Sequence, residues 1–247
     1  MKKVAFPNGV PLFLLQSVII LLLVACDGSN GDTGVNPGGV DDVTYDVDAN
    51  GIPRFVETDY IDLGSIYRIS RFRSAEGHDY SDEFESCRSM KHYYNPQTGT
   101  DWAQIPIYSP VSGRVVRVFE EWAGTQVQIT SDDYPAFRFV IFHIDLGASL
   151  EEGDQVAAGQ QLGTHIGSQT MSDIAVAVNT PDGRKRISYF EVMSDGLFQQ
   201  YQDRGVAARS DLIISKDERD ADPLTCDGES FTSDGSIEGW VYLNPVP

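Results

Sequence analysis

The sequence predicts a mainly β protein, organised as a twisted antiparallel sheet with one short C-terminal helix and a loop-rich tail. Two observations within residues 105–178 support this prediction. Short runs of β-branched and aromatic residues recur there, and clusters of Gly, Pro, Asp and Ser separate them, as in strands joined by tight turns. In addition, the segment GDQVAAGQ is typical of a hairpin between two such strands.

The composition is that of a globular domain with a strongly acidic surface. The chain has 247 residues, 37 acidic and 18 basic side chains, a formal net charge of -19 and a hydrophobic content of 41%. That hydrophobic content is normal for a chain that folds around a core. Binding of duplex nucleic acid requires clustered Lys and Arg, so we expect no nucleic-acid partner.

Residues 1–25 are expected to be an export signal. Lys2 and Lys3 precede a short apolar run that contains no acidic residue. Residues 23–26 resemble a bacterial lipobox, which implies cleavage before Cys26 and lipidation of its sulfur. The protein would then be anchored to a membrane of the cell envelope, inner or outer, through lipid. An uncleaved membrane anchor is the alternative.

Residues 26–57 are expected to be a flexible acidic linker, because their first part has almost nothing to bury. Their second part matches the spacing D-x-D-x-N-G-x5-E of a calcium loop, in which staggered oxygens converge on the ion. The oxygen donors would be Asp46, Asp48, Asn50 and Glu57. A proline stands where such a loop normally forms a short strand, so a polar turn is the alternative.

Residues 58–247 are expected to form the folded domain, with its core at residues 73–178. Residues 60–72 alternate in hydrophobicity as one or two strands, and His78 and Asp82 follow them. An imidazole nitrogen and a carboxylate oxygen are ordinary zinc donors. This pair therefore predicts half of a metal site, with a hydrogen-bonded surface pair as the alternative.

The order of these segments resembles the core of the lysostaphin-type zinc peptidoglycan endopeptidases, metallopeptidase family 23. The resemblance rests on Gly77-His78-x-x-x-Asp82, on the strand that contains His143 and on the hairpin after it. It implies an antiparallel sheet of the duplicated-hybrid-motif type, in which His78 and Asp82 supply two of three zinc ligands. It also implies that His143 lies outside the metal ligands and positions the attacked carbonyl; a satisfied core histidine is the alternative.

The chain departs from this family in its last core strand. Family members carry H-x-H there, and both imidazoles point into a groove because residues i and i+2 of a strand face the same side. Here Asp173 stands at the first position, that of a catalytic base, and Ala175 at the second, that of the third zinc ligand. A methyl group cannot bind zinc, so His165 and His92 are the possible substitute ligands.

Residues 83–104 are an insertion relative to the family and contain aromatic and basic side chains such as Lys91 and Tyr93. These side chains either contact a sugar or peptide near the groove or pack the inserted loop. The insertion also contains Cys87, and the tail contains Cys226. An even pair of cysteines in an oxidising compartment predicts a disulfide, with two separate buried thiols as the alternative.

The tail is expected to contain few elements. Residues 194–203 have the pattern of a short helix, with Ser194 as its N-cap. Short strands are expected at residues 212–214 and 240–243, and residues 219–231 are expected to form a loop that packs against the insertion.

These observations predict a cell-envelope lipoprotein with a peptidase-like domain that is catalytically degenerate. Such a domain would bind peptidoglycan or control a cell-wall hydrolase, and this expectation depends on Ala175. An active zinc endopeptidase with an altered third ligand is one alternative. A calcium-dependent surface lipoprotein is another.

Overall fold

The computed structural model describes residues 43–245 of the chain. The predicted signal peptide, the predicted lipidation site Cys26 and the first part of the predicted linker lie outside the described residues and stay predictions. Within residues 43–245, no helix has the length and apolar character that are needed to cross a bilayer.

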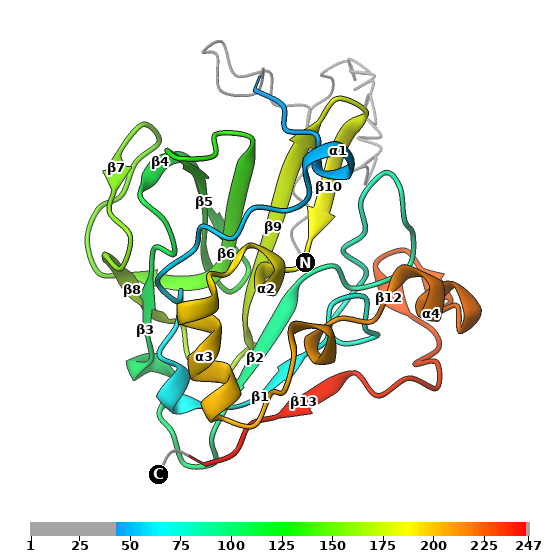
Figure 1. Cartoon of the computed structure of the whole chain (residues 1–247). Coiled ribbons are helices and arrows are strands. Elements are labelled where there is room, and N and C mark those ends of the chain that lie inside the picture. The colour runs from blue at the N-terminus through cyan, green and yellow to red at the C-terminus, as the bar shows by residue number, and fades with distance from the viewer. Residues whose placement is uncertain (1–42, 246–247) are drawn as a thin grey trace, which may run out of the picture. The chain divides into compact units, whose positions relative to one another are not determined.

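The described residues form a mainly β structure, as predicted (Figure 1). Eleven strands make one antiparallel sheet, whose main path has the order β13-β1-β2-β9-β6-β5-β4-β7, with β10 beside β9 and the β3–β8 pair beside β6. The sheet strands are β1 Ile66–Ser70, β2 His92–Pro96, β3 Pro106–Tyr108, β4 Gly113–Glu121, β5 Gly124–Ser131, β6 Phe137–Leu146, β7 Gln155–Val156, β8 Gln161–His165, β9 Ser172–Thr180, β10 Gly183–Ile187 and β13 Trp240–Tyr242. A separate hairpin consists of β11 (Cys226–Asp227) and β12 (Ser230–Phe231).

The sheet packs one face into the hydrophobic core. Side chains alternate along a strand, so Ile174 and Val176 of β9 point into this core. There they meet α2 (Tyr189–Val192) and α3 (Asp195–Asp203), which lie over this face in Figure 1. The opposite face carries Asp173 and Ala175, and we call it the site face.

The helix predicted at residues 194–203 is confirmed as α3. The Ser194 hydroxyl accepts the N–H of Leu197 and caps the helix, and Leu197, Phe198 and Tyr201 bury its apolar stripe. The other short helices are α1 Val47–Asn50, η1 Leu63–Ser65, η2 Trp102–Gln104, η3 Arg209–Leu212 and α4 Lys216–Ala221.

The short strands predicted in the tail have different outcomes. The strand predicted at residues 240–243 is β13, which pairs with β1. The strand predicted at residues 212–214 is wrong, because its first residue ends η3 and Ile213 makes a single isolated bridge to Phe72. The carbonyl of Leu212 and the N–H of Ile214 do bond to Phe72, but η3 directly before this bridge and α4 directly after it limit the pairing to one residue.

The start of the folded domain differs from the predicted boundary at residue 58. Val56 is fully buried, and the N–H groups of Phe55 and Val56 both donate to the carbonyl of Val192. The ring of Phe55 also lies 4.4 Å from that of Tyr134, centroid to centroid. Aromatic and β-branched side chains therefore bind the described second part of the predicted linker to the core.

The predicted insertion, residues 83–104, contains an interior strand of the sheet. Strand β2 lies between β1 and β9, and its residues His92, Tyr93 and Tyr94 are buried. These side chains are therefore sheet residues rather than parts of an inserted loop.

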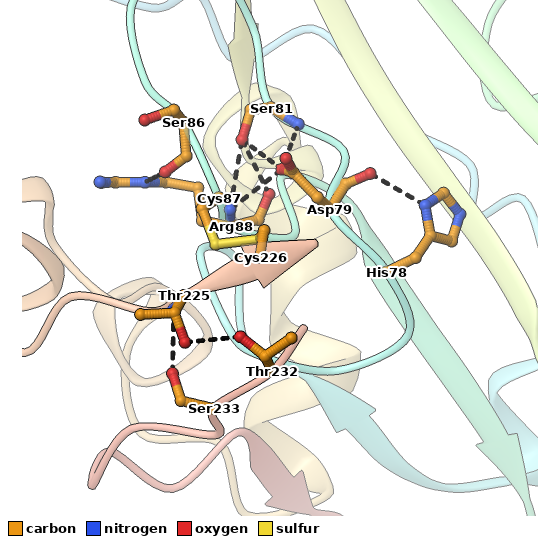
Figure 2. Close-up of a disulfide and its surroundings, with 10 residues drawn as sticks. All are labelled: His78, Asp79, Ser81, Ser86, Cys87, Arg88, Thr225, Cys226, Thr232 and Ser233. Atoms are coloured by element: carbon orange, nitrogen blue, oxygen red, sulfur yellow. Dashed lines mark hydrogen bonds between the residues drawn. A yellow bond between two sulfur atoms is a disulfide. The ribbon is translucent and has the colours of Figure 1, made fainter. Parts of the chain in front are cut away.

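The predicted disulfide between Cys87 and Cys226 is confirmed, with the two Cα atoms 5.7 Å apart (Figure 2). It joins the loop before β2 to the β11–β12 hairpin. A second link lies beside it, because the N–H of Asp79 donates to the carbonyl of Glu229 at 2.8 Å. The tail hairpin therefore holds the loop that carries His78, which Figure 2 shows on the far side of Asp79 from the disulfide.

Candidate functional site

Strands β2 and β9 bring the polar residues of the site face together. Tyr93 of β2 pairs with Asp173 of β9. Because side chains alternate, Lys91 and Tyr93 lie on the site face beside Asp173, while His92 lies on the core face. Sequence analysis named both Asp173 and Lys91 but did not predict that they pair. The available signal was the run Lys91-His92-Tyr93-Tyr94, in which every second residue shares a face.

Lys91 and Asp173 form a buried ion pair. The Nζ of Lys91 lies 2.5 Å from Oδ2 of Asp173, and the two side chains are 2% and 0% exposed. Burial alone would lower the pKa of Lys91, but attraction to Asp173 outweighs it and raises the pKa. Neither oxygen of Asp173 accepts a well-aligned hydrogen bond from the described residues, so the contact is ionic.

Aromatic rings enclose the ammonium group of Lys91. Its Nζ lies 4.1 Å from the ring centroid of Phe142, 4.8 Å from that of Tyr80 and 5.0 Å from that of Tyr93. A cation over the faces of aromatic rings is attracted by their negative face. The site face therefore carries a fixed internal cation.

His143 faces the same carboxylate from β6. Its backbone has a φ of 62°, in the left-handed region that residues other than Gly rarely adopt, and this interrupts the alternation of the strand. As a result Phe142 and His143 both contact site-face residues. The Nε2 of His143 lies 3.3 Å from Oδ1 of Asp173, and its Nδ1 lies 2.8 Å from the carbonyl oxygen of Ala123. Both ring nitrogens thus have partners inside the protein.

His165 ends β8 and pairs with Ile144 of β6. Its Nδ1 accepts the N–H of Gly167 at 3.2 Å, and its Nε2 is buried without a well-formed hydrogen bond among the described residues. Burial lowers the pKa of His165 to about 4. The imidazole is therefore neutral near pH 7, and its ring packs against Trp102 with 5.7 Å between centroids.

His92 has both ring nitrogens engaged on the core face. They lie 2.8 Å from the carbonyl oxygen of Ser70 and 2.8 Å from the hydroxyl of Ser188. Burial lowers the pKa of His92 to about 4. The structure therefore places this possible substitute ligand on the opposite side of the sheet from Asp173.

His78 and Asp82 lie in the loop before β2, and their side chains form hydrogen bonds with different groups. The Nδ1 of His78 lies 2.9 Å from the carbonyl oxygen of Asp79. Asp82 accepts two main-chain N–H groups of its own turn, and its Oδ2 accepts the N–H of Arg186 at 2.8 Å. Burial, followed by the charge of Lys91, lowers the pKa of His78. The carboxylate of Asp82 thus joins this loop to β10.

Ala175 is 1% exposed and lies in a small apolar cluster with Val140, Phe142 and Tyr80. An imidazole in its place would have to displace one of these neighbours. Among residues 43–245, no three His, Cys, Asp or Glu side chains lie close enough together to hold a metal ion. Because Asp173 holds Lys91 and the third position is a methyl group, the residues of the site face do not fit the zinc site that the resemblance implies.

The calcium loop suggested by the sequence is a capped helical turn. The Oδ1 of Asp46 accepts two main-chain N–H groups and begins α1. Asp48 pairs with Lys185, with 2.5 Å between Oδ2 and Nζ. Asn50 donates to the carbonyl of Asp46. These groups are not gathered with Glu57 into a metal-binding cluster within the described part of the chain.

Comparison with known proteins finds similarity in fold alone. No family model matches the chain, and no curated protein matches it. Solved structures of lysostaphin-type peptidases do resemble part of it.

Three of these structures illustrate the extent of the similarity. The catalytic domain of lysostaphin from Staphylococcus simulans is 18% identical, with a TM-score of 0.34 over 49% of this chain and 88% of that domain. A zinc-containing peptidase of Vibrio cholerae is 20% identical, with a TM-score of 0.35 over 55% of this chain and 39% of its own. Csd3 of Helicobacter pylori is 20% identical, with a TM-score of 0.41 over 57% and 35%. The chain thus spans well under half of the last two proteins.

Proposed function

We propose that this chain is a lipid-anchored protein of the cell envelope whose site face binds the peptide part of peptidoglycan without hydrolysing it. The observation that carries the proposal is the buried ion pair of Lys91 and Asp173 beside Ala175. Zinc-dependent hydrolysis requires three protein ligands and an activated water. Here the position of the third ligand is a methyl group, and the residue at the position of the base is held by an ammonium group.

The contacts of His143 support a binding role over a catalytic one. A general base needs a nitrogen within hydrogen-bond reach of the proton that it removes. The Nδ1 of His143 contacts the carbonyl of Ala123, and its Nε2 faces Asp173. The imidazole can therefore support the shape of the site face but has no nitrogen directed at a substrate.

An exposed tryptophan beside this histidine supports ligand contact. Trp122 is 80% exposed, and its ring centroid lies 5.9 Å from that of His143. A large aromatic side chain left in water next to a buried polar cluster is typical of a surface that receives a ligand. Sugars and peptides both pack against such a ring.

The sequence supports this proposed location. Cys26 and the apolar run before it imply a lipid anchor, which would hold the domain against the envelope where peptidoglycan is available. A cell-wall hydrolase is the alternative partner of the same face.

A sedimentation assay tests the proposal. The full chain, purified in detergent, is mixed with purified peptidoglycan sacculi, and the fraction that sediments is measured. We expect retention of the wild type and at least threefold weaker retention of Trp122→Ala. The matched control is Tyr242→Ala, which removes an aromatic ring that is 55% exposed on β13. Equal retention of both variants, or no retention of the wild type, would contradict the proposal.

A further inference from the structure

Arg186 occupies a distinctive place on the site face. It lies on β10 and pairs with Ala177 of β9, which pairs in turn with Arg138 of β6. Directly opposed residues of antiparallel strands point to the same face. Ala177 shares its face with Ala175 and Asp173, so Arg186 borders the small apolar floor next to the buried ion pair.

Two neighbouring residues fix the guanidinium of Arg186, one through a hydrogen bond to its edge and one through ring stacking on its face. Its Nε donates to the carbonyl of Ser81 at 3.2 Å, and its Cζ lies 3.7 Å from the ring centroid of Tyr80. Tyr80 is itself fixed, because its ring packs edge-on against Phe142 with 5.6 Å between centroids. The position of the guanidinium is therefore set before any ligand arrives.

Among the residues that the structure describes, no acidic side chain pairs with the outer edge of the same guanidinium. Within residues 43–245, no carboxylate forms an ion pair with Arg186, although Asp82 lies close by. The oxygens of Asp82 accept main-chain N–H groups instead, including that of Arg186 itself. The two Nη groups thus stay available, although the chain has a net charge of -19 and acidic side chains are plentiful.

This arrangement is suited to one class of ligand group. A planar guanidinium presents two parallel N–H donors that match the two oxygens of a carboxylate or phosphate. Ala175 and Ala177 beside it are only 1% and 3% exposed, so the guanidinium, and not this buried floor, is the group that can contact a ligand. A highly acidic protein repels a polyanion, so a single carboxylate on a peptide is favoured over a phosphate polymer.

We propose that Arg186 binds a carboxylate of the peptide that lies on the site face. This inference rests on the proposed function, because it names the group by which the peptide is recognised. The stacked Tyr80 and the carbonyl of Ser81 position the guanidinium, and the Nη groups bind the carboxylate through two charge-assisted hydrogen bonds.

Binding of soluble muropeptides tests the inference. The probe is the muropeptide mixture that a muramidase releases from purified sacculi, together with the same mixture after conversion of its carboxylates to amides. Binding to the full chain is measured by calorimetry or fluorescence. We expect Arg186→Gln to weaken binding of the untreated mixture at least tenfold. Amidation should weaken wild-type binding by a similar factor and have little further effect on Arg186→Gln.

Two further variants sharpen the comparison. Arg114→Gln is the matched control. Arg114 of β4 is exposed and lies in the same line of cross-strand pairs as Arg186, but several strands away from Tyr80. This variant should bind the muropeptides as the wild type does. Arg186→Lys keeps the charge but loses the paired donors, and it should bind with intermediate affinity. Arg186→Lys also provides the comparison if Arg186→Gln does not fold.

The outcomes separate this inference from the proposed function. Wild-type binding that Arg186→Gln leaves unchanged, or an effect of amidation that persists in Arg186→Gln, would overturn the inference alone. Competition by inorganic phosphate without any effect of amidation would show a phosphate site and would also overturn it. Failure of the wild type to bind both muropeptides and sacculi would overturn the inference and the proposed function together.

Discussion

Lys91 is a charged side chain in a position where water does not reach it. Its ammonium group depends on Asp173 for compensation, and Asp173 depends on Lys91 in turn, since both are almost fully buried. Removing one member of a buried pair leaves the other charge uncompensated, which is far more destabilising than replacing both. The pair therefore ties the loop before β2 to β9.

We expect Lys91→Met to lower the free energy of unfolding by about 3 to 5 kcal/mol. Adding Asp173→Asn to Lys91→Met should restore part of the lost stability, because a neutral amide in place of Asp173 leaves no uncompensated buried charge. Chemical denaturation of the wild type, both single variants and the double variant gives the coupling energy. Single effects that simply add would show that the two residues do not stabilise one another.

Asp59 is a second buried acid, located among tyrosines on the core side. It accepts hydrogen bonds from the hydroxyl of Tyr201, from that of Tyr189 at 3.4 Å and from the N–H of Tyr60 at 2.8 Å. Burial nevertheless raises the pKa of Asp59 to about 6. The folded state therefore favours the protonated carboxyl more than the unfolded chain does.

This shift predicts a pH dependence of stability. A raised pKa means that the contribution of Asp59 is fully present below pH about 4 and is lost as the pH rises through about 6. Asp59→Asn should remove this component, which is on the order of 2 kcal/mol between pH 4 and 7. The measurement is the unfolding free energy of wild type and variant at several pH values. A difference between them that does not change with pH would refute the assignment.

At the scale of elements, the sequence predicted correctly the elements that depend on contacts between residues close together in the chain. Helix α3 was predictable because its cap at Ser194 and its apolar stripe lie within ten residues. Strand β2 was not recognised, because its partners β1 and β9 are far away in the sequence and a strand of five residues has a weak pattern of its own. His143 turns to the site face because its φ is positive, and no local sequence motif indicates this backbone conformation.

The disulfide holds two elements that share no strand pairing. It closes a loop with a sequence separation of 139 residues, so the chain-entropy model gives a stabilisation of roughly 5 kcal/mol. We expect the double variant Cys87→Ala, Cys226→Ala to lose about 3 to 5 kcal/mol of unfolding free energy. Thermal unfolding of the wild type with and without reductant provides the control. A reduced wild type as stable as the oxidised protein would contradict this.

At the scale of the whole molecule, the sequence indicated the fold more fully than the site. The strand order and hairpins of residues 105–178 predicted the sheet, and alternation placed Asp173 and Ala175 on one face. The role of Lys91 and the direction of the Asp82 carboxylate could not be predicted, because both depend on contacts between distant segments. The arrangement of the site therefore differs from the metal site that the sequence motif predicted, and the differences lie where β2, β9 and β10 meet.

The account depends on a face that binds peptidoglycan peptide but does not cleave it. Its most direct test is an incubation of the full chain with purified sacculi and added zinc, followed by measurement of soluble muropeptides and of sedimented protein. We predict that the protein sediments with the sacculi and releases no muropeptides, and that Ala175→His also releases none. Release by the wild type that a chelator and His78→Ala both abolish would contradict the account and establish a working peptidase.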